Sequence, residues 1–293
     1  MFYRCRIFRQ GGQAMFETYC SAGMENKPKP PVKWAGGKGQ LIPQFDPLLP
    51  KNDYHLYIEP FVGGGAVFFH LLPSKAILID NNKELINFYL AVRDNLEQLL
   101  HSLKKHENTA DYYYQVRALD AEKLSPVERA SRFLYLNKTA YNGLWRVNSS
   151  GKHNVPFGRY KNPRIADEHN LRLVSEVLKQ AELIHGDFSR VLDCAGPGSF
   201  VYFDPPYHPL SETASFTGYT PESFSAGDQR RLAAVFRELD RMGCTVMLSN
   251  SDTPFIRELY SGYDVKVVRA RRAINCRADK RGPVNELVIR NYV

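Results

Sequence analysis

The chain has 293 residues, and 39 Lys or Arg against 31 Asp or Glu give it a net charge of +8. With 43% hydrophobic and 12% aromatic residues it can build a substantial core, and its composition is not that of a disordered, collagen-like or coiled-coil protein. No segment approaches the roughly 18 consecutive apolar residues that a spanning helix needs, which argues against a membrane protein.

The cysteines and the first residues bear on where the protein works. Five scattered cysteines without paired spacing support neither a disulfide framework nor a cysteine zinc site, so we expect a reducing, cytoplasmic environment. The start contains Arg4, Arg6 and Arg9 and no apolar run, which argues against a secretory signal. Because a second methionine, Met24, opens a proline-rich segment, we predict that residues 1–26 are an N-terminal extension outside the fold.

A strand, a glycine turn, a helix and a second strand follow in order. Residues 56–59 show a short strand pattern, three glycines stand at 63–65, residues 66–72 are an apolar helical run, and residues 76–80 are a buried strand that ends in Asp80. This order predicts one βαβ unit.

Helical patterns then dominate until the sheet resumes. One helix is predicted from residue 83 to about residue 103, and a tyrosine-rich helical stretch continues through residue 136. Residues 137–163 are rich in Gly, Ser, Asn and Pro and predict an irregular loop or hairpin. Further strands are predicted at 182–187, 200–203, 244–249, 263–268 and 286–289, with helices at 228–242 and 254–260. The economical architecture is an α/β sheet interrupted by a mainly helical insertion at about residues 104–179.

The positive charge is concentrated in two windows. Residues 138–164 hold six basic residues and no acidic one, and residues 269–281 hold six basic residues and one acidic residue. Because the first window also contains Tyr141, Trp145, Phe157 and Tyr160, it fits a nucleic-acid surface, where cations bind phosphates and aromatic rings stack on bases. A solvated basic loop that binds nothing is the alternative.

The glycine turn favours a nucleotide-like cofactor. A strand that runs into Gly63, Gly65 and a helix lets backbone N–H groups approach a ligand, and Asp80 can accept hydrogen bonds from ribose hydroxyls. A dinucleotide and an adenosyl cofactor both fit, although the G-x-G-x-x-G fingerprint is incomplete because residue 68 is Phe. The alternatives are a tight structural turn at the glycines and a helix N-cap at Asp80.

A second glycine-containing segment lies upstream and includes Trp34 and Lys38. It is not a phosphate loop, because Lys38 is followed by Gly39 and no hydroxyl ligand for magnesium follows. A nucleoside triphosphatase is therefore disfavoured.

A third candidate site follows the predicted strand at residues 200–203. It consists of Asp204, Pro205, Pro206 and Tyr207, at the edge where open α/β sheets bind ligands. The prolines fix φ and lack N–H groups, so they stiffen the turn and leave carbonyl oxygens for a substrate. This suits methylation of an amino group on an aromatic base: Asp204 and the Pro205 carbonyl would accept hydrogen bonds from the NH₂ group and turn its lone pair toward a sulfonium methyl donor. Tyr207 would stack on the base, and no metal is required. A base inside a duplex must be flipped out to reach this turn. The alternative is an acidic strand end with a rigid turn.

Six segments together resemble, in order, the motifs of the Dam family of DNA adenine methyltransferases. They are residues 33–38 (KWAGGK), 59–65 (EPFVGGG), 78–80 (LID), 186–188 (GDF), 204–207 (DPPY) and 246–251 (VMLSNS). The resemblance implies a Rossmann-like methyltransferase domain in residues 27–103 and 180–293, with a target-recognition domain that binds DNA inserted at residues 104–179.

The resemblance also implies the cofactor and its site. S-adenosylmethionine would be the methyl donor, with no metal. By matched position its site would be lined by Trp34, Lys38, Phe61, Gly63, Gly65, Asp80, Asp187, Phe188 and Asp204. Carboxylates suit both ribose hydroxyls and a cationic donor that bears an amino group.

The basic window resembles the family's hairpin that reads GATC in double-stranded DNA. The resemblance implies DNA contacts from Lys33, Arg117, Tyr141, Asn142, Arg146, Pro156 and Arg159. In this likeness Arg146 contacts a guanine, as arginine does bidentately through O6 and N7. Tyr141 and Asn142 would probe the gap left by the flipped base, and Lys33 would help to read the outer guanine. Trp145 departs from the family, in which this residue is often smaller, so the packing of the hairpin stays open.

We therefore expect a site-specific enzyme that transfers a methyl group from S-adenosylmethionine to the exocyclic amino nitrogen of adenine in duplex DNA, at GATC, by base flipping. The nearest alternatives are a cytosine amino methyltransferase and a non-catalytic DNA-binding module on the same fold. The hairpin favours adenine, and intact Asp204 and Tyr207 argue against a module without activity. The sequence leaves open whether a cognate restriction endonuclease acts in the same system.

Overall fold

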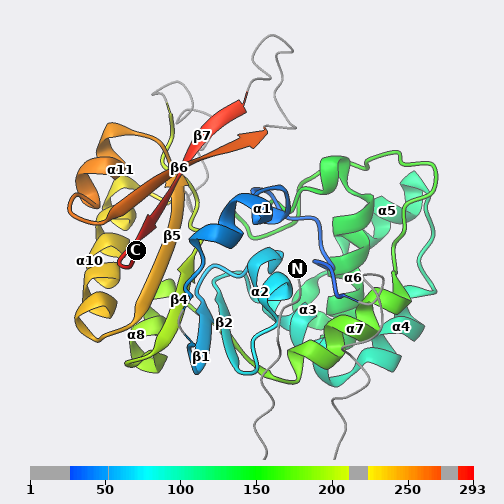
Figure 1. The fold of residues 1–293 in the computed structure, drawn as a ribbon. Coiled ribbons are helices and arrows are strands. Elements are labelled where there is room, and N and C mark those ends of the chain that lie inside the picture. Colours follow the sequence, from blue (N-terminus) through cyan, green and yellow to red (C-terminus); the bar gives the residue numbers. More distant parts are fainter. Residues whose placement is uncertain (1–26, 52, 211–223, 272–282) are drawn as a thin grey trace, which may run out of the picture.

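The computed structural model describes residues 27–51, 53–210, 224–271 and 283–293 (Figure 1). The predicted N-terminal extension and most of the second basic window lie outside these residues. Within them, no helix is both long and apolar enough to cross a lipid bilayer.

A mixed sheet forms the centre of the fold. Its strands are β1 Leu56–Glu59, β2 Ala76–Asp80, β3 Ala181–His185, β4 Ser199–Phe203, β5 Thr245–Ser251, β6 Asp264–Arg271 and β7 Pro283–Arg290. In the described residues they lie in the order β3-β2-β1-β4-β5-β7-β6; the first five are parallel, and β7 is antiparallel to both of its neighbours. The prediction of an α/β, Rossmann-like methyltransferase sheet is confirmed.

The central strands β1 and β4 are buried on both faces, as expected for parallel strands. Because side chains alternate along a strand, Tyr57, Leu78 and Phe200 face one side with α2 Ala66–Leu71 and α3 Lys83–Asp94. Ile58 and Val201 face the other side with α10 Ala226–Arg241 and α11 Pro254–Leu259. Of these helices, α2, α10 and α11 match predicted ones apart from small shifts at their ends, and α3 covers only the first part of the helix predicted over residues 83–103.

The helix predicted over residues 83–103 is wrong as a single element. It is two helices, α3 and α4 Leu96–Leu103, because Asn95 leaves the helical region with φ −136° and ψ 34°. The break redirects the chain, so that Leu99, Leu100 and Leu103 are buried in the common core.

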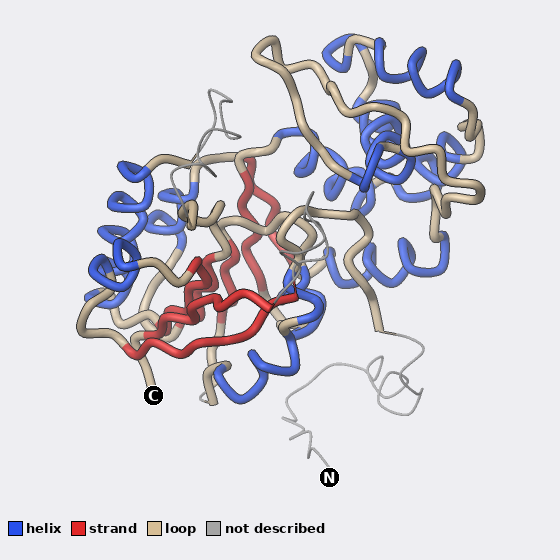
Figure 2. Tube along the Cα trace, turned by 90° about the horizontal axis from the view of Figure 1, so that it is seen from above, coloured by secondary structure: helices blue, strands red, loops and turns tan. Residues whose placement is uncertain are grey.

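The remaining long helices gather beside the β3 side of the sheet, as Figures 1 and 2 show. They are α5 Ala110–Ala118, α6 Pro126–Thr139 and α7 Glu168–Leu178. A capping box between Ser125 and Glu128 starts α6. The chain after α6 is held by two isolated bridges, Ala140 to Phe157 and Val147 to His153, so the predicted irregular hairpin is present.

Short elements complete the described chain. They are η2 Lys38–Gln40, α1 Ile42–Phe45, η3 Asp46–Leu48, η4 Ala121–Lys123, η5 Tyr141–Gly143, η6 Phe188–Arg190 and α8 Val191–Cys194.

Candidate active site and DNA interface

The carboxyl ends of three neighbouring parallel strands bring predicted site residues together. β1 leads into the glycine turn, β2 ends at Asp80, and β4 leads into Asp204. Because β1 lies between β2 and β4 and all three run the same way, these segments emerge at one edge of the sheet. The Gly63 N–H donates to Asp80 Oδ2 at 3.0 Å, which joins the first two segments directly.

The glycine turn packs closely against Trp34. Gly63 has φ +46°, and a Cβ at this position would lie 2.6 Å from Trp34 Cδ1. The Gly63 carbonyl accepts a hydrogen bond from the buried Tyr89 hydroxyl at 2.8 Å. Gly65, the N-cap of α2, also has positive φ, at +70°. Both glycines are therefore required by the conformation of the turn.

Asp80 anchors this turn and keeps capacity for a ligand. Its second oxygen, Oδ1, accepts from the Asn82 N–H at 2.9 Å. Burial raises the pKa of this carboxyl, and the two backbone N–H groups act in the opposite direction. A carboxylate has about four lone-pair sites, so further acceptor sites remain. The N-cap of α3 is Asn82, which accepts from the N–H groups of Glu84 and Leu85. The helix-cap alternative for Asp80 is therefore wrong.

Asp204 is paired with a buried lysine. Lys38 is 5% exposed, and its Nζ lies 2.7 Å from Asp204 Oδ1. The same ammonium donates to the Gly36 carbonyl at 2.6 Å and lies 4.7 Å from the centre of the Tyr207 ring. Burial raises the pKa of Asp204, and the Lys38 charge opposes this rise. Lys38 thus holds the carboxyl in place and favours its ionised form.

Tyr207 is fixed at both its ring and its hydroxyl. The hydroxyl donates to Glu286 Oε2 on β7 at 2.9 Å. Burial raises the pKa of Tyr207 well above its ordinary value, so the phenol stays protonated and neutral. With Lys38 beside the ring, the aromatic group has a defined orientation next to Asp204.

Three further predicted residues meet at the end of β3. The Phe61 and Phe188 rings stack with centroids 5.3 Å apart and an interplanar angle of 25°. Asp187 accepts from the Ser189 N–H at 3.0 Å and pairs with Arg231 Nη2 at 2.7 Å. The Arg231 guanidinium also lies 4.5 Å from the centre of the Phe188 ring.

Sequence reasoning missed two residues of this site. Glu286 lies 79 residues after Tyr207, and Arg231 lies 44 residues after Asp187. The only signal for Glu286 was an acid directly before an apolar strand segment. Arg231 had no signal, because a charged residue on an amphipathic helix is ordinary.

The residues predicted to contact DNA surround the hairpin. All of them except Arg117 are exposed, and Arg117 is half-buried. Arg146 Nε donates to Asn154 Oδ1 across the hairpin at 2.8 Å. Arg117 Nη1 donates to the Val155 carbonyl at 3.1 Å, and the Tyr141 N–H donates to the Pro156 carbonyl at 2.9 Å. Trp145 packs on Phe133 with ring centroids 4.4 Å apart, so the large side chain is accommodated beneath the hairpin.

Lys33 links the hairpin to the segment that carries Lys38. Its N–H donates to Asn137 Oδ1 at 2.9 Å, and its carbonyl accepts from Asn137 Nδ2 at 2.7 Å. Its ammonium lies 4.3 Å from the centre of the Tyr160 ring. One predicted DNA residue, Lys33, and two predicted cofactor residues, Trp34 and Lys38, therefore share one short segment that Asn137 braces.

A basic cleft of about 700 Å³ opens beside Lys33. Its charged lining consists of Lys27, Lys29, Lys33, Lys138, Arg164 and Asp167. The acid, Asp167, is paired with Arg164 at 2.8 Å. Burial and the neighbouring Lys33 charge lower the pKa of Lys138 to about 8. Such an excess of positive charge suits a polyanion.

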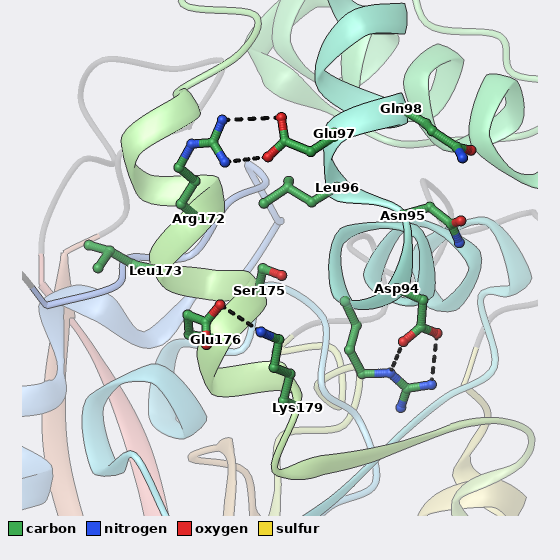
Figure 3. A pocket seen from close by; sticks show the side chains of 11 residues that line it. Asp94, Asn95, Leu96, Glu97, Gln98, Arg172, Leu173, Ser175, Glu176 and Lys179 are labelled. Atoms are coloured by element: carbon green, nitrogen blue, oxygen red, sulfur yellow. Dashed lines mark hydrogen bonds and ion pairs between the residues drawn. The ribbon is translucent and has the colours of Figure 1, made fainter. Parts of the chain in front are cut away.

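A second cleft, of about 510 Å³, lies between α7 and the junction of α3 and α4 (Figure 3). Its charged side chains pair with one another: Arg172 with Glu97, Lys179 with Glu176, and Arg93 with Asp94. This internal pairing makes it a poor candidate for binding a charged ligand.

Comparison with known proteins points to one class of enzyme. Residues 34–274 match the model of the D12 class of N6 adenine-specific DNA methyltransferases. The chain is 46% identical to the type II methyltransferase M1.LlaDCHI of Lactococcus lactis subsp. cremoris over 90% of this chain and 95% of that protein. It is 45% identical to the type II methyltransferase M.MjaIII of Methanocaldococcus jannaschii, over 90% and 99%. It is 38% identical to the DNA adenine methylase of Escherichia coli, over 88% and 93%.

The chain belongs to the D12 class of N6 adenine-specific DNA methyltransferases. It is an enzyme that uses S-adenosylmethionine and acts on adenine in DNA, and the predicted family and activity are confirmed.

Proposed function

We propose that this enzyme methylates adenine in GATC sites of duplex DNA and that the edge formed by β1, β2 and β4 holds both reactants. The observation that carries this proposal is the position of Asp204 at the same sheet edge as the Gly63–Asp80 contact. This chain is 38% identical to the DNA adenine methylase of Escherichia coli over most of both chains, and this similarity supports GATC as the target sequence.

The cofactor-site residues suit S-adenosylmethionine. Its bound form supplies a methyl group on a positively charged sulfur. Gly63 allows backbone N–H groups to approach a ligand, and Asp80 keeps acceptor sites for hydroxyls. Phe61 and Phe188 offer apolar ring surface beside Asp187, a carboxylate that accepts hydrogen bonds from the Ser189 N–H and from Arg231 and can also accept from a ligand. We assign Trp34, Lys38 and Gly65 to the same site. Trp34 packs against the glycine turn, Gly65 belongs to that turn, and Lys38 pairs with Asp204.

Asp204 and the Pro205 carbonyl do the chemical positioning. The exocyclic nitrogen of adenine is a weak nucleophile because its lone pair is delocalised into the ring. When Asp204 and the Pro205 carbonyl each accept one N–H, the nitrogen is drawn toward tetrahedral geometry and its lone pair becomes available. Tyr207, held by Glu286, provides the ring on which the base stacks. Pro206 keeps the turn rigid.

The target adenine must leave the duplex to reach this turn, at a cost of a few kcal/mol. We propose that the hairpin supports this exchange. Tyr141 is 54% exposed, and Asn142 is exposed with a left-handed φ of 55°, so both are accessible to DNA. Arg146 reads a guanine, with Pro156 beside it, and Lys33 reads the outer guanine. Arg117 and Arg159 meet phosphates or base edges, and the basic cleft meets phosphates.

We make three further proposals, about the domains, a partner enzyme and the location of the protein. Residues 27–103 and 180–293 form the catalytic domain, and residues 104–179 form the target-recognition domain. The similarity to two type II methyltransferases supports a cognate restriction endonuclease in the same system. The scattered cysteines, which lack paired spacing, support a cytoplasmic location.

A direct test uses labelled S-adenosylmethionine and pairs of duplex oligonucleotides that differ only in one GATC site. We expect label only in the duplex with GATC, and nucleoside analysis should place it on adenine. Equal labelling of both duplexes contradicts the sequence choice, and labelled cytosine contradicts the adenine assignment.

A further inference from the structure

Two buried amides outside the catalytic residues brace the turn that holds Asp204. Gln229, in the first turn of α10, and Asn250, on β5, are both 0% exposed. Gln229 Nε2 donates to the Pro206 carbonyl at 2.9 Å, and Asn250 Nδ2 donates to Gln229 Oε1 at 3.0 Å. Three segments that are far apart in the sequence are thereby joined behind Asp204.

The direction of this hydrogen-bond chain is set by the backbone. Asn250 Oδ1 accepts from the N–H groups of His208 at 3.1 Å and Ser251 at 2.8 Å. Its amino group must therefore face Gln229, which must present its oxygen to Asn250 and its own amino group to Pro206. Each link leaves one correct orientation for the next.

The hydrogen-bond chain fixes the backbone on both sides of Tyr207. Pro206 is held through its carbonyl, and His208 is held through its N–H by Asn250 and through its carbonyl by Ser251 Oγ at 2.7 Å. Because Pro206 has its carbonyl occupied by Gln229, the carbonyl of Pro205 is the one left for a substrate. Breaking a link leaves a buried polar group without a partner, which makes the brace costly to distort.

We propose that Gln229 and Asn250 are positioning residues for methyl transfer: they orient the Pro205 carbonyl and Tyr207 without touching either reactant. This inference rests on the proposed function of the turn. Small displacements of reacting groups lower rates steeply, whereas most of the residues proposed to bind DNA and cofactor lie outside this turn. Loss of the brace should therefore lower the rate of the chemical step and leave both affinities intact.

The test compares Gln229→Met and Asn250→Leu with a matched control, Asn291→Leu. Asn291 also braces β5 through its amide: it accepts from the Val246 N–H at 2.7 Å and donates to the Asp240 carboxylate at 2.7 Å and the Cys244 carbonyl at 2.8 Å. It does so at the opposite end of β5, far from the catalytic turn. Single-turnover methyl transfer, cofactor affinity and DNA affinity are measured for each variant below its unfolding temperature.

We expect a loss of about ten- to a hundredfold in the single-turnover rate of the two brace variants, with unchanged affinities and a control close to wild type. Because the links act in series, the double variant should lose no more than the worse single variant. A folded Gln229→Met enzyme with the wild-type rate overturns the proposal, and so does an equal loss in Asn291→Leu.

Hydrogen exchange on the wild-type enzyme provides a second readout that does not depend on activity. The His208 amide should exchange as slowly as the buried amides of β5, and fast exchange at His208 overturns the brace even where the variants fail to fold. A wild-type enzyme that labels no adenine contradicts the proposed function instead, and the exchange result then still judges the brace.

Discussion

In the proposed mechanism, the Asp204 carboxyl determines how the rate of methyl transfer responds to pH. Burial raises its pKa above the ordinary value, and Lys38 counteracts this effect. Only the ionised carboxyl is a pure acceptor, so the single-turnover rate should fall as the pH drops through this raised pKa. Replacing Lys38 with Met removes the opposing charge, raises the pKa further and should move the acid limb of the profile to higher pH. An unmoved acid limb in Lys38→Met contradicts this account of the pair.

In the proposed function, Arg146 determines which base is accepted at one position of the target sequence. It is exposed, and its guanidinium is oriented by Asn154 at 2.8 Å. Arg146→Ala should relax discrimination at one guanine by about 1–3 kcal/mol, measured as kcat/KM on GATC and on duplexes with one base replaced. The control is Lys152→Ala, which changes an exposed lysine at the tip of the hairpin. If Arg146→Ala lowers the rates on all duplexes equally, Arg146 contacts the backbone and not a base.

In the proposed function, cofactor binding depends on the glycine turn between β1 and α2. A Cβ on Gly63 would meet Trp34 at 2.6 Å in a conformation with positive φ. Gly63→Ala should therefore introduce strain of about 1–3 kcal/mol and lower the affinity for the cofactor, measured by calorimetry without DNA. Gly196→Ala is the matched control, because no atom lies within 4 Å of its Cβ. Wild-type affinity in Gly63→Ala would show that the turn does not contact the cofactor.

The elements also show what could and could not be predicted from sequence. The strands and the motif turns were predictable, because apolar alternation and glycine or proline geometry are local properties. The break at Asn95 was not, because an asparagine is tolerated inside helices and only the packing of Leu99 and Leu103 favours the change of direction. The pairings of Tyr207 with Glu286 and of Pro206 with Gln229 join residues that are 79 and 23 positions apart. No local pattern carries such information.

At the scale of the whole molecule, charge is unevenly distributed. Residues 138–164 are basic without an acid, and the cleft beside them gathers lysines from residues 27–33 and from α6. The affinity for DNA should therefore fall steeply with salt, with a slope of about −0.9 per phosphate contact in a plot of log affinity against log salt. The affinity for the cofactor, measured in the same buffers, is the control and should change little. A flat DNA profile contradicts the proposed phosphate contacts.

The central claim is that Asp204 holds the amine of an extruded adenine for transfer. The most direct measurement is single-turnover methylation of a GATC duplex by Asp204→Ala, together with the affinity of the same variant for that duplex. We predict that transfer is nearly abolished while DNA affinity stays at the wild-type level. Transfer by Asp204→Ala at the wild-type rate would contradict the mechanism.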